Sequence, residues 1–556
     1  MTKKLWIRPE PARRGLGTGF SALQRAILER RGLKTDREIE AFMNRQYGLE
    51  TDPFQLSDMD RAIDRLQAAR RAGERVVVYG DYDADGTTAT TLLTHVFGSL
   101  GLDTGWYIPD RFKEGYGLNE SALAEIHKGG AAVVVSVDCG IRSNEIVESA
   151  NTLGLDVIIT DHHLPGPELP PALAVIDPNR ADDLYPFKGL AGVGLAYKLA
   201  QGLVKSSGGA DVEKYLDLVA VGTVADLAPL IDENRFLVAA GIEQLNATTR
   251  PGLRALAEFA GHGQGSITSS SIGFGLGPRL NAAGRVADAS LAVQLLLATE
   301  GSEAWEYAGK LDRLNRERRR LTNETLKRAR MLALEQPQSE NLLVAADSEF
   351  HQGVIGLVAG RLAEEFYRPA LVARIEGNVL SGSARSIPEF HITEALQACD
   401  DLLIRFGGHA QAAGFSLLVE DRQEFVTRLS ELAADRLAGL DLRPRLEIDA
   451  SVSFDELDEE LMAFIDRLQP CGQANPYPVF STSGVELHSK RKVGQGGRHL
   501  KLTLRHAGRI FDAIAFGFGE QSDALPDRLE LAYRLERNEF RGVVSLQLNV
   551  QDFRPL

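Results

Sequence analysis

The run RVVVYGDYDADGTTATTLL, residues 75–93, decides the fold that the sequence predicts. It opens with a short β-branched stretch without polar alternation, which is typical of a strand buried on both faces. Three carboxylates follow within five residues, at Asp81, Asp83 and Asp85, and a helical pattern begins directly after them. Because such close carboxylates repel one another unless a cation lies among them, the run predicts a strand, a cation-binding turn and a helix.

Three more β-branched runs follow along the chain, at 131–137, 155–160 and 173–177, each with a helical pattern after it. Strands that alternate with helices in this way form a parallel sheet covered by helices. Ligands bind such open sheets in the crevice outside the carboxyl ends of the strands. We therefore predict an α/β domain with its functional site at that edge.

Acidic and imidazole side chains lie where these strands end. Asp138 follows the second run, Asp161, His162 and His163 follow the third, and Asp226 stands in the later apolar stretch LVAVGTVADLAPL. The donors are mostly carboxylates and no thiolate is convincingly among them, so the set is hard and selects Mn²⁺ or Mg²⁺. Two such ions, about 3.5–4 Å apart, are a known arrangement for phosphodiester hydrolysis. The acidic triplet alone also fits a solvated turn or one calcium loop, but the residues at neighbouring strand ends favour a paired-metal site.

The chain has 556 residues and a formal net charge of −15, from 62 basic and 77 acidic residues. At roughly 150 residues per domain, this length predicts three or four domains. The net charge excludes an overall coat of positive charge but leaves room for a local basic groove. Apolar and charged fractions of 44% and 25% are those of an ordinary globular protein.

Nothing in the sequence points to a membrane or to an oxidising compartment. No apolar run approaches the ~20 residues that cross a bilayer, and the start, MTKKLWIRPEPARR, lacks the apolar core of a signal peptide. The three cysteines, Cys139, Cys399 and Cys471, are far apart and show no CxxC spacing, so they build neither a disulfide framework nor a zinc ribbon. We expect a cytoplasmic protein without membrane contact.

Sequence patterns divide the chain into five predicted segments. A stretch without Gly or Pro, rich in strong helix formers, predicts a long connecting helix, and alternating strands near the end predict a small β-barrel. The segments are an N-terminal helical segment (1–70), a first α/β domain (71–304), the connecting helix (305–336), a second α/β domain (337–440, with a helical run around 392–405) and the barrel (441–556).

Several motifs carry a resemblance to a known family. GDYDADG, VDCG, TDHH and GTVADLAPL resemble, in order and spacing, the four phosphoesterase motifs of the DHH superfamily. GPRLNAAGR (277–285), SGSARS (381–386) and GGHAQAAGFSL (407–417) are similar to the RecJ family of single-strand-specific exonucleases, and the resemblance covers nearly the whole chain. It implies a parallel-sheet DHH domain joined by a long helix to an α/β DHHA1 domain, followed by a C-terminal oligonucleotide-binding (OB) fold barrel.

The resemblance also implies roles for individual residues. Two metal ions are expected on Asp83, Asp85, Asp138, His162 and Asp226, with Asp81, Asp161 and His163 also in the catalytic set. Nucleic acid is expected on Arg111, Ser383 and Arg385 (a terminal phosphate), on Arg279, Asn281 and Arg285 (the backbone) and on His409 (a phosphate). The chain departs from the family at Tyr79, where many DHH proteins have a metal-ligating His, so one metal is expected to bind more weakly.

Two basic segments offer further contacts for a polyanion. Residues 312–330 hold eight basic and three acidic residues, and a solvated, salt-bridged helix and a DNA contact both remain open for them. Residues 488–509 hold seven basic residues and no acidic one. Because the second segment falls on the predicted barrel, a fold that often binds single strands, it favours a DNA contact.

The resemblance implies a metal-dependent 5′–3′ exonuclease on single-stranded DNA that releases mononucleotides in recombination and repair. It also implies cooperation with a single-stranded DNA-binding protein and a RecQ-type helicase. Two alternatives stay open: a DHH phosphodiesterase acting on short RNA or dinucleotides, and a binding or scaffold protein on an inactivated DHH fold. The filled acidic positions count against the scaffold, and the barrel and basic segments count against the phosphodiesterase.

Overall fold

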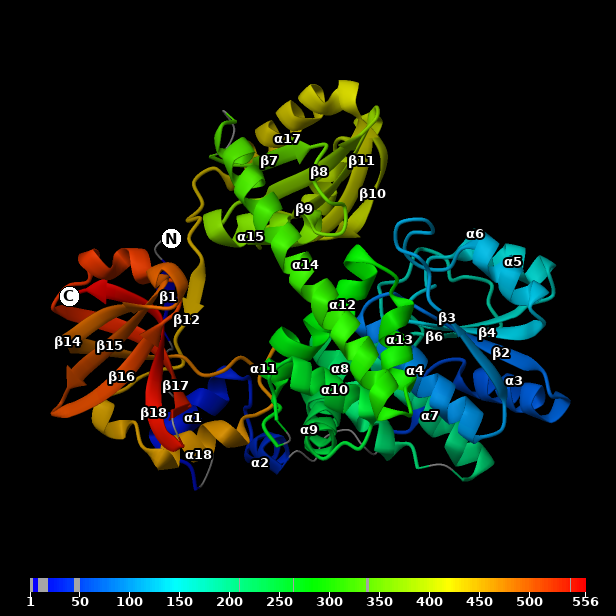
Figure 1. The fold of residues 1–556 in the computed structure, drawn as a ribbon, viewed down its shortest axis with the longest axis horizontal. Helices are drawn as coiled ribbons and strands as arrows, with labels where there is room; N and C mark the ends of the chain where they lie inside the picture. Colours follow the sequence, from blue (N-terminus) through cyan, green and yellow to red (C-terminus); the bar gives the residue numbers. More distant parts are fainter. Residues whose placement is uncertain are drawn as a thin grey trace. The chain divides into compact units, whose positions relative to one another are not determined.

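The computed structural model of the chain is drawn in Figure 1. It describes residues 4–8, 19–44, 51–209, 211–263, 265–336, 340–540 and 542–556, so parts of the predicted N-terminal segment (1–3, 9–18 and 45–50) lie outside the described residues. The chain divides into two compact units. The first unit comprises Met1–Leu5, Arg279–Leu291 and Ala308–Arg445, and the second comprises Trp6–Pro278, Ala292–Tyr307 and Leu446–Leu556. No helix in the described ranges has the length and apolar character needed to cross a membrane.

The described N-terminal residues form short helices and one strand. The elements are β1 (Leu5–Ile7), α1 (Ala22–Arg30), α2 (Asp36–Asn44), the 3-10 turn η1 (Pro53–Gln55) and α3 (Met59–Ala72). Helix α3 ends at Gly73, whose φ of 67° is the left-handed conformation that glycine adopts most readily at a helix end. Strand β1 pairs with β12 (Arg445–Glu447) in a two-stranded sheet.

A five-stranded parallel sheet organises the first α/β domain, within the second unit. Its strands are β2 (Arg75–Gly80), β3 (Asp103–Tyr107), β4 (Ala131–Val137), β5 (Asp156–Thr160) and β6 (Ala174–Ile176), in the order β3-β2-β4-β5-β6. The four predicted strands are confirmed. The sequence missed β3, because this edge strand (DTGWY) is only half-buried and lacks a β-branched run. The strand order reverses between β2 and β4, and such switch points open a crevice at the carboxyl ends of the strands.

Helices cover both faces of this sheet (Figure 1). Helices α5 (Glu120–Lys128) and α6 (Asn144–Thr152) lie on one face, and α3, α4 (Ala84–Ser99) and α7 (Gly192–Ser207) lie on the other. A helical layer continues the second unit with η2 (Glu213–Tyr215), α8 (Leu216–Ala225), α9 (Asp232–Asn246), α10 (Pro251–Phe259), α11 (Ser269–Ser271), the π-helical turn η3 (Ile272–Leu276) and most of α13 (Ser290–Leu297). Helix α12 (Gly277–Val286) lies mostly in the first unit. Val76, Val78 and Val135 are fully buried, as the absence of polar alternation predicts.

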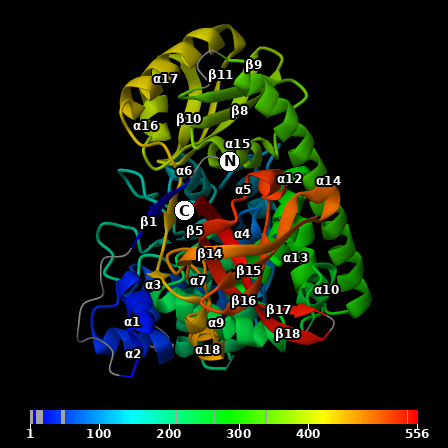
Figure 2. The ribbon, with the colours of Figure 1, turned by 90° about the vertical axis from the view of Figure 1, so that its left-hand side faces the viewer.

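The long helix α14 (Gly301–Leu334) precedes the sheet of the first unit, whose order is β10-β11-β9-β8-β7. Its strands are β7 (Leu343–Asp347), β8 (Ala370–Glu376), β9 (Val379–Arg385), β10 (Leu403–His409) and β11 (Ala412–Leu418). Figure 2 shows α17 (Arg422–Leu437) on one face of this sheet and α15 (Ile355–Phe366) on the other, and each helix buries an apolar cluster against it.

One prediction in this sheet is wrong. The helical run expected around 392–405 ends with α16 (Ile392–Gln397) and the 3-10 turn η4 (Asp400–Leu402), and the chain then enters β10. Strand β10 pairs with β11 from Leu403 to His409 in an antiparallel hairpin. The tertiary pairing therefore overrides a local helical pattern. The turn η5 (Val419–Asp421) follows β11.

The predicted C-terminal barrel is confirmed. Its strands are β13 (Ala450–Ser451), β14 (Phe480–Val493), β15 (His499–His506), β16 (Arg509–Ala515), β17 (Arg528–Phe540) and β18 (Val543–Pro555), with α18 (Glu459–Arg467) and the turns η6 (Phe454–Glu456), η7 (Gln495–Gly497) and η8 (Gly519–Ala524) between them. A pairing of β14 with β17 closes the sheet. Alternate residues of the strands, such as Leu500, Leu502 and Leu504, fill its core.

Candidate metal centre and nucleic-acid contacts

The turn between β2 and α4 presents the acidic triplet. Asp83 caps α4, because its Oδ1 accepts hydrogen bonds from the backbone N–H groups of Asp85 (2.8 Å) and Gly86 (3.1 Å). A Cβ at Gly86 would lie 2.5 Å from the carbonyl oxygen of Asp81, so only glycine lets the chain double back this tightly. The turn therefore holds Asp81, Asp83 and Asp85 at the carboxyl end of β2.

The first turn of α7 supports Asp85. The two carboxylate oxygens of Asp85 accept hydrogen bonds from the backbone N–H groups of Gly192 (2.7 Å) and Val193 (2.8 Å). A Cβ at Gly192 would lie 2.7 Å from the Cβ of Asp138, so glycine is required where the helix approaches both acids. Burial, followed by the charge of Asp83, nevertheless raises the pKa of Asp85 to about 7.

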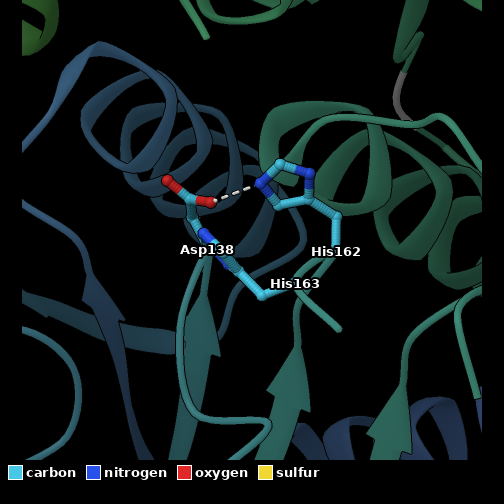
Figure 3. Close-up of side chains that lie close together, drawn as sticks. All are labelled: Asp138, His162 and His163. Atoms are coloured by element: carbon cyan, nitrogen blue, oxygen red, sulfur yellow. Dashed lines mark ion pairs between the residues drawn. The ribbon is translucent and has the colours of Figure 1, made fainter. Parts of the chain in front are cut away.

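Asp138 and His162 meet across the ends of β4 and β5. Asp138 has a φ of 63°, an uncommon conformation for a residue other than glycine. Its Oδ1 lies 3.0 Å from the Nε2 of His162, the contact drawn as a dashed line in Figure 3. The contact lacks hydrogen-bond geometry, and both atoms are buried without a hydrogen-bond partner. Two buried atoms that can each bind a metal, so close together and without hydrogen-bond partners, fit a shared cation better than a direct hydrogen bond.

The Nε2 of His162 is also near two further carboxylates. It lies 3.9 Å from Asp226 Oδ2 and 4.0 Å from Asp85 Oδ2. Burial, followed by the carboxylates of Asp85 and Asp83, raises the pKa of Asp226 to about 9. Burial, followed by the charge of His163, lowers the pKa of His162 to about 4, which leaves the imidazole neutral, as a metal ligand must be.

Asp161 is saturated with hydrogen bonds and orients its neighbours. Its oxygens accept from the N–H groups of Ile141, His162 and His163, and its Oδ1 lies 2.7 Å from His163 Nδ1. Burial acts to raise the pKa of Asp161, but the hydrogen bond and charge of His163 outweigh it and lower the pKa. Burial acts to lower the pKa of His163, and the partnership with Asp161 outweighs it and raises that pKa to about 9. This shift favours the cationic form of His163.

The residues present fit a divalent cation. Three groups have ligand atoms within 4.8 Å of one another: Asp85, His162 and Asp226; Asp81, Asp83 and Asp138; and Asp138, His162 and His163. The buried Asp81 Oδ1 also lacks a hydrogen-bond partner. Burial, followed by neighbouring carboxylates, raises the pKa of Asp138 well above its usual range, a cost that a cation would remove. Carboxylates with one or two imidazoles are suitable ligands for Mn²⁺ or Mg²⁺.

Tyr79 lies away from these groups. Its ring is fully buried and packs against Tyr107 with centroids 5.2 Å apart. Its hydroxyl donates to the carbonyl of Gly117 and accepts from Asn119 Nδ2, both at 3.0 Å. Tyr79 is thus part of the core of the domain, where its hydroxyl makes these two hydrogen bonds.

The sequence interpretation missed three residues around the site. Asp177 follows β6 and is fully buried, with Oδ2 lacking a hydrogen-bond partner, and Asn179 Nδ2 donates to the carbonyl of His162 at 2.7 Å. The sequence could have indicated Asp177, because this acid stands at the end of a β-branched run as Asp138 does. Tyr116, whose hydroxyl lies 3.2 Å from the carbonyl oxygen of Asp138 and 3.3 Å from His163 Nδ1, stands in a loop that gave no such signal.

In the first unit, Ser383 and Arg385 lie on β9 against the first turn of α15. A Cβ at Gly356 would lie 3.1 Å from both Ser383 Oγ and Arg385 Nη2, and Arg385 Nη1 donates to Ser383 Oγ at 2.9 Å. His409 is opposite Ala412, which is opposite Arg385, so the side chains of His409 and Arg385 are on the same face of the sheet. A hydroxyl, a guanidinium and a helix N-terminus together suit a phosphate.

The remaining predicted contacts lie elsewhere. Arg279 is mostly buried, and its Nε and Nη2 lie 3.1 and 3.0 Å from Asp312 Oδ1. Asn281 and Arg285 lie on α12. In the second unit, Arg111 places its Cζ 5.0 Å from the ring centroid of Tyr82, and its charge acts on Asp81.

Three family models match the chain in succession. The model described as "DHH family, N-terminal domain" matches residues 75–223, "DHHA1 domain" matches 339–435, and "RecJ OB domain" matches 448–552. These ranges contain, in order, the parallel sheet, the second sheet and the barrel described above.

Known proteins match nearly the whole chain. The single-stranded-DNA-specific exonuclease RecJ of Bacillus subtilis (strain 168) is 39% identical, covering 96% of this chain and 68% of that protein. Its namesake from Salmonella typhimurium is 38% identical and covers 96% of each. The crystal structure of RecJ from Thermus thermophilus in complex with Mn²⁺ has a TM-score of 0.83 at 31% identity, covering 96% of this chain and 76% of that one. The Mg²⁺ complex of that protein has a TM-score of 0.76 at 29% identity, covering 99% and 78%.

Proposed function

The chain belongs to the RecJ family of single-stranded-DNA-specific exonucleases, and on this premise we propose that it releases mononucleotides from the 5′ end of single-stranded DNA. The observation that carries the proposal is the gathering of seven ligand residues, from four separate motifs, within reach of divalent cations. We infer that Asp83, Asp85, Asp138, His162 and Asp226 hold two Mn²⁺ or Mg²⁺ ions, with Asp81 beside them. Ions bound there activate water and stabilise the oxygen that leaves the phosphorus.

Residues of the protein position the DNA strand for phosphodiester hydrolysis. Asp161 holds His163 in its cationic form, and the imidazolium then contacts the scissile phosphate. Tyr116 fixes the backbone of Asp138 and the ring of His163, and α7 orients Asp85 through two amides. These contacts exist without substrate, so the groups need little reorganisation when the strand binds.

Binding of the terminal 5′ phosphate would set the direction in which the DNA strand is degraded. We propose that Ser383 and Arg385, with the first turn of α15, bind the 5′ phosphate, and that His409 contacts a phosphate beside it. In the second unit, Arg111 is proposed to contact a DNA phosphate through its own guanidinium. Arg279, Asn281 and Arg285 are proposed to bind the DNA backbone. The basic residues 488–509 on β14, β15 and the turns beside them extend the contact on the barrel.

We further propose that the protein acts in recombination and repair in the cytoplasm, together with a single-stranded DNA-binding protein and a RecQ-type helicase. The three free thiols, of Cys139, Cys399 and Cys471, are consistent with a reducing compartment. The alternative activity on short RNA or dinucleotides is disfavoured by the barrel, which a two-residue substrate does not need.

The function is tested with a single strand labelled at its 3′ end, with and without a 5′ phosphate, beside the same strand in a blunt duplex. With Mn²⁺ or Mg²⁺ we expect shortening of the single strand from its 5′ end and none after EDTA. Asp138→Ala should lower the rate at least about 100-fold, because loss of a ligand costs at least as much as loss of a residue that orients one.

DNA binding by Asp138→Ala should stay within a few-fold of the unmodified protein. Asp103→Asn, an exposed carboxylate at the start of β3, is the matched control and should cleave normally. Binding without cleavage by the unmodified protein would support the scaffold alternative, and faster turnover of dinucleotides than of long strands would support the phosphodiesterase.

A further inference from the structure

Four guanidinium groups come together in the first unit, outside the residues proposed to bind the terminal phosphate. Arg318 and Arg319 lie on α14, Arg361 on α15 and Arg279 on α12; we call them the arginine cluster. Burial, followed by the charges of Arg319, Arg361 and Arg279, lowers the pKa of Arg318 to about 10. The charges of the other three arginines therefore act on Arg318.

Neighbouring arginines of α14 are neutralised, but three of the four arginines in the cluster are not. Arg316 pairs with Asp312, Arg320 with Glu317 and Glu324, and Arg330 with Glu365. In contrast, Arg318, Arg319 and Arg361 form no ion pair with any residue that the structure describes. The partner of Arg361 Nη1 is the neutral Oδ1 of Asn323, at 2.9 Å. Asp312, which pairs with Arg279, is shared with Arg316.

Arg318 carries a second sign of an absent partner. Its Nε is buried and has no hydrogen-bond partner in the described part of the chain. An unmade hydrogen bond at a buried charged group costs about 1–3 kcal/mol or more, and unpaired like charges add to that cost. The folded protein tolerates this arrangement, which fits a site built to receive an anion.

The cluster adjoins the residues proposed to bind the 5′ phosphate. Gly356 and Gly360 lie one helical turn apart on α15, and Cβ atoms there would lie 3.1 Å from Arg385 Nη2 and 3.9 Å from Arg385 Cγ. Arg361 is the next residue along α15 and reaches Asn323 of α14. Basic side chains thus extend from Arg385, beside Ser383, across α15 to α14.

We propose that the arginine cluster binds a backbone phosphodiester of the single strand, as a second phosphate site beyond the one that holds the 5′ end. The proposal rests on the proposed function, because it takes DNA as the polyanion. Arg319 and Arg361 are exposed and face solvent, whereas Arg318 is half-buried between the helices. Guanidinium forks match phosphate oxygens in geometry as well as charge.

The test measures binding of a 5′-phosphorylated oligo(dT) without divalent metal, between about 50 and 200 mM salt. Each phosphate contact on a single strand contributes about 0.7 to the slope of log K against log salt. Arg318→Gln and Arg361→Gln should each reduce the slope by up to about 0.7 and weaken binding several-fold. Arg318→Lys should keep most of the slope, and Arg320→Gln, on the same helix but paired with two acids, should leave it unchanged.

Thermal unfolding separates phosphate binding from a structural role. Because Arg318 is repelled by its neighbours, Arg318→Gln should leave the melting temperature unchanged or raise it, whereas removal of a structural arginine would lower it. A methylphosphonate linkage removes the phosphate charge. An oligo(dT) with this linkage at the proposed site should bind the unmodified protein and Arg318→Gln with equal affinity. Inorganic phosphate alone serves as a further probe: binding of phosphate but no change in the oligo(dT) slope would indicate a site for free anion and overturn the proposal.

Failure of the proposal can be distinguished from failure of the proposed function. A protein that degrades the single strand, but whose Arg318→Gln and Arg361→Gln variants keep the full salt slope, overturns the phosphate site alone. A protein that degrades no DNA overturns the function, while the salt slopes still report on the cluster. If Arg318→Gln does not fold, Arg361→Gln at the exposed edge of the cluster decides the question.

Discussion

His95, on α4, stacks on the ring of Tyr215 with centroids 5.8 Å apart and planes 22° apart. Both side chains line a cavity of about 720 Å³, together with Lys214, Arg250 and Asp217; Asp211 and Glu213 line it as well. Burial, followed by the charges of Arg250 and Lys214, lowers the pKa of His95 to about 4. The carboxylate of Asp217 does not restore the pKa of His95, because it is paired with Arg250.

This pKa predicts a pH dependence of stability. In the unfolded chain His95 has a pKa near 6.5, so below that pH the unfolded state binds a proton that the folded state excludes until about pH 4. The free energy of unfolding therefore falls as pH decreases through this window, by up to roughly 3 kcal/mol from His95. His95→Gln should lose that part of the pH dependence, which urea unfolding at about pH 7 and pH 5 would measure. Equal losses of stability in both proteins would contradict the assignment.

At the scale of single residues, the sequence predicted the residues that the structure brings together. Acids at the ends of apolar strands indicated a cation, because they are costly to bury without one. The resemblance to the family implied the ligand set Asp83, Asp85, Asp138, His162 and Asp226, whose potential ligand atoms lie within reach of one another. The sequence could not show that Asp161 is saturated by three amides, since this depends on the path of the loop. Asp177 was missed although its position after β6 carried the same signal.

At the scale of elements, the amino end of α7 is a part of the site that the sequence analysis did not point to. The backbone amide of Gly192 there binds Asp85, which is 107 positions away in the chain. Strands β2, β4, β5 and β6 were predictable because they are buried on both faces. Strands β9, β10 and β11 were not, because glycine and small polar residues hide their pattern and only the pairing of distant segments forms them.

Substitution of Gly192 tests the role of α7. In Gly192→Ala the new Cβ would lie 2.7 Å from the Cβ of Asp138, so the helix must move away from Asp85 and Asp138. We expect metal affinity to fall about 10–100-fold, as when other residues that orient ligands are lost. The rise in melting temperature on adding Mn²⁺ would measure it without relying on activity. Gly98→Ala, near the end of α4 with nothing within 4 Å of its Cβ, is the control, and equal Mn²⁺ affinities for the two variants would contradict the role of α7.

At the scale of the whole molecule, a buried side chain helps to join the barrel to the catalytic domain within the second unit. Arg235 of α9 is 2% exposed, and its guanidinium donates to the carbonyls of Arg467 and Leu468, at the end of α18 and before β14. Its Cζ lies 3.9 Å from the ring centroid of Phe42 in α2. Nearby, the N–H of Leu230, four residues after Asp226, donates to the carbonyl of Gln473 at 2.8 Å. The segment that carries Asp226 is thus tied to the barrel.

Arg235→Leu should break this connection. It removes the Arg235 hydrogen bonds to the carbonyls of Arg467 and Leu468, of which the Leu468 carbonyl keeps a second side-chain donor, Asn475, and we expect unfolding to become easier by about 3 kcal/mol. Because the barrel would no longer be held beside the catalytic domain, kcat/KM should fall more for a long single strand than for a short one that does not reach the barrel. Arg254→Leu, an exposed arginine on the neighbouring helix α10, should change neither quantity. A loss of stability with an unchanged ratio of long-strand to short-strand kcat/KM would mean that Arg235 stabilises the fold without aligning the barrel with the metal centre.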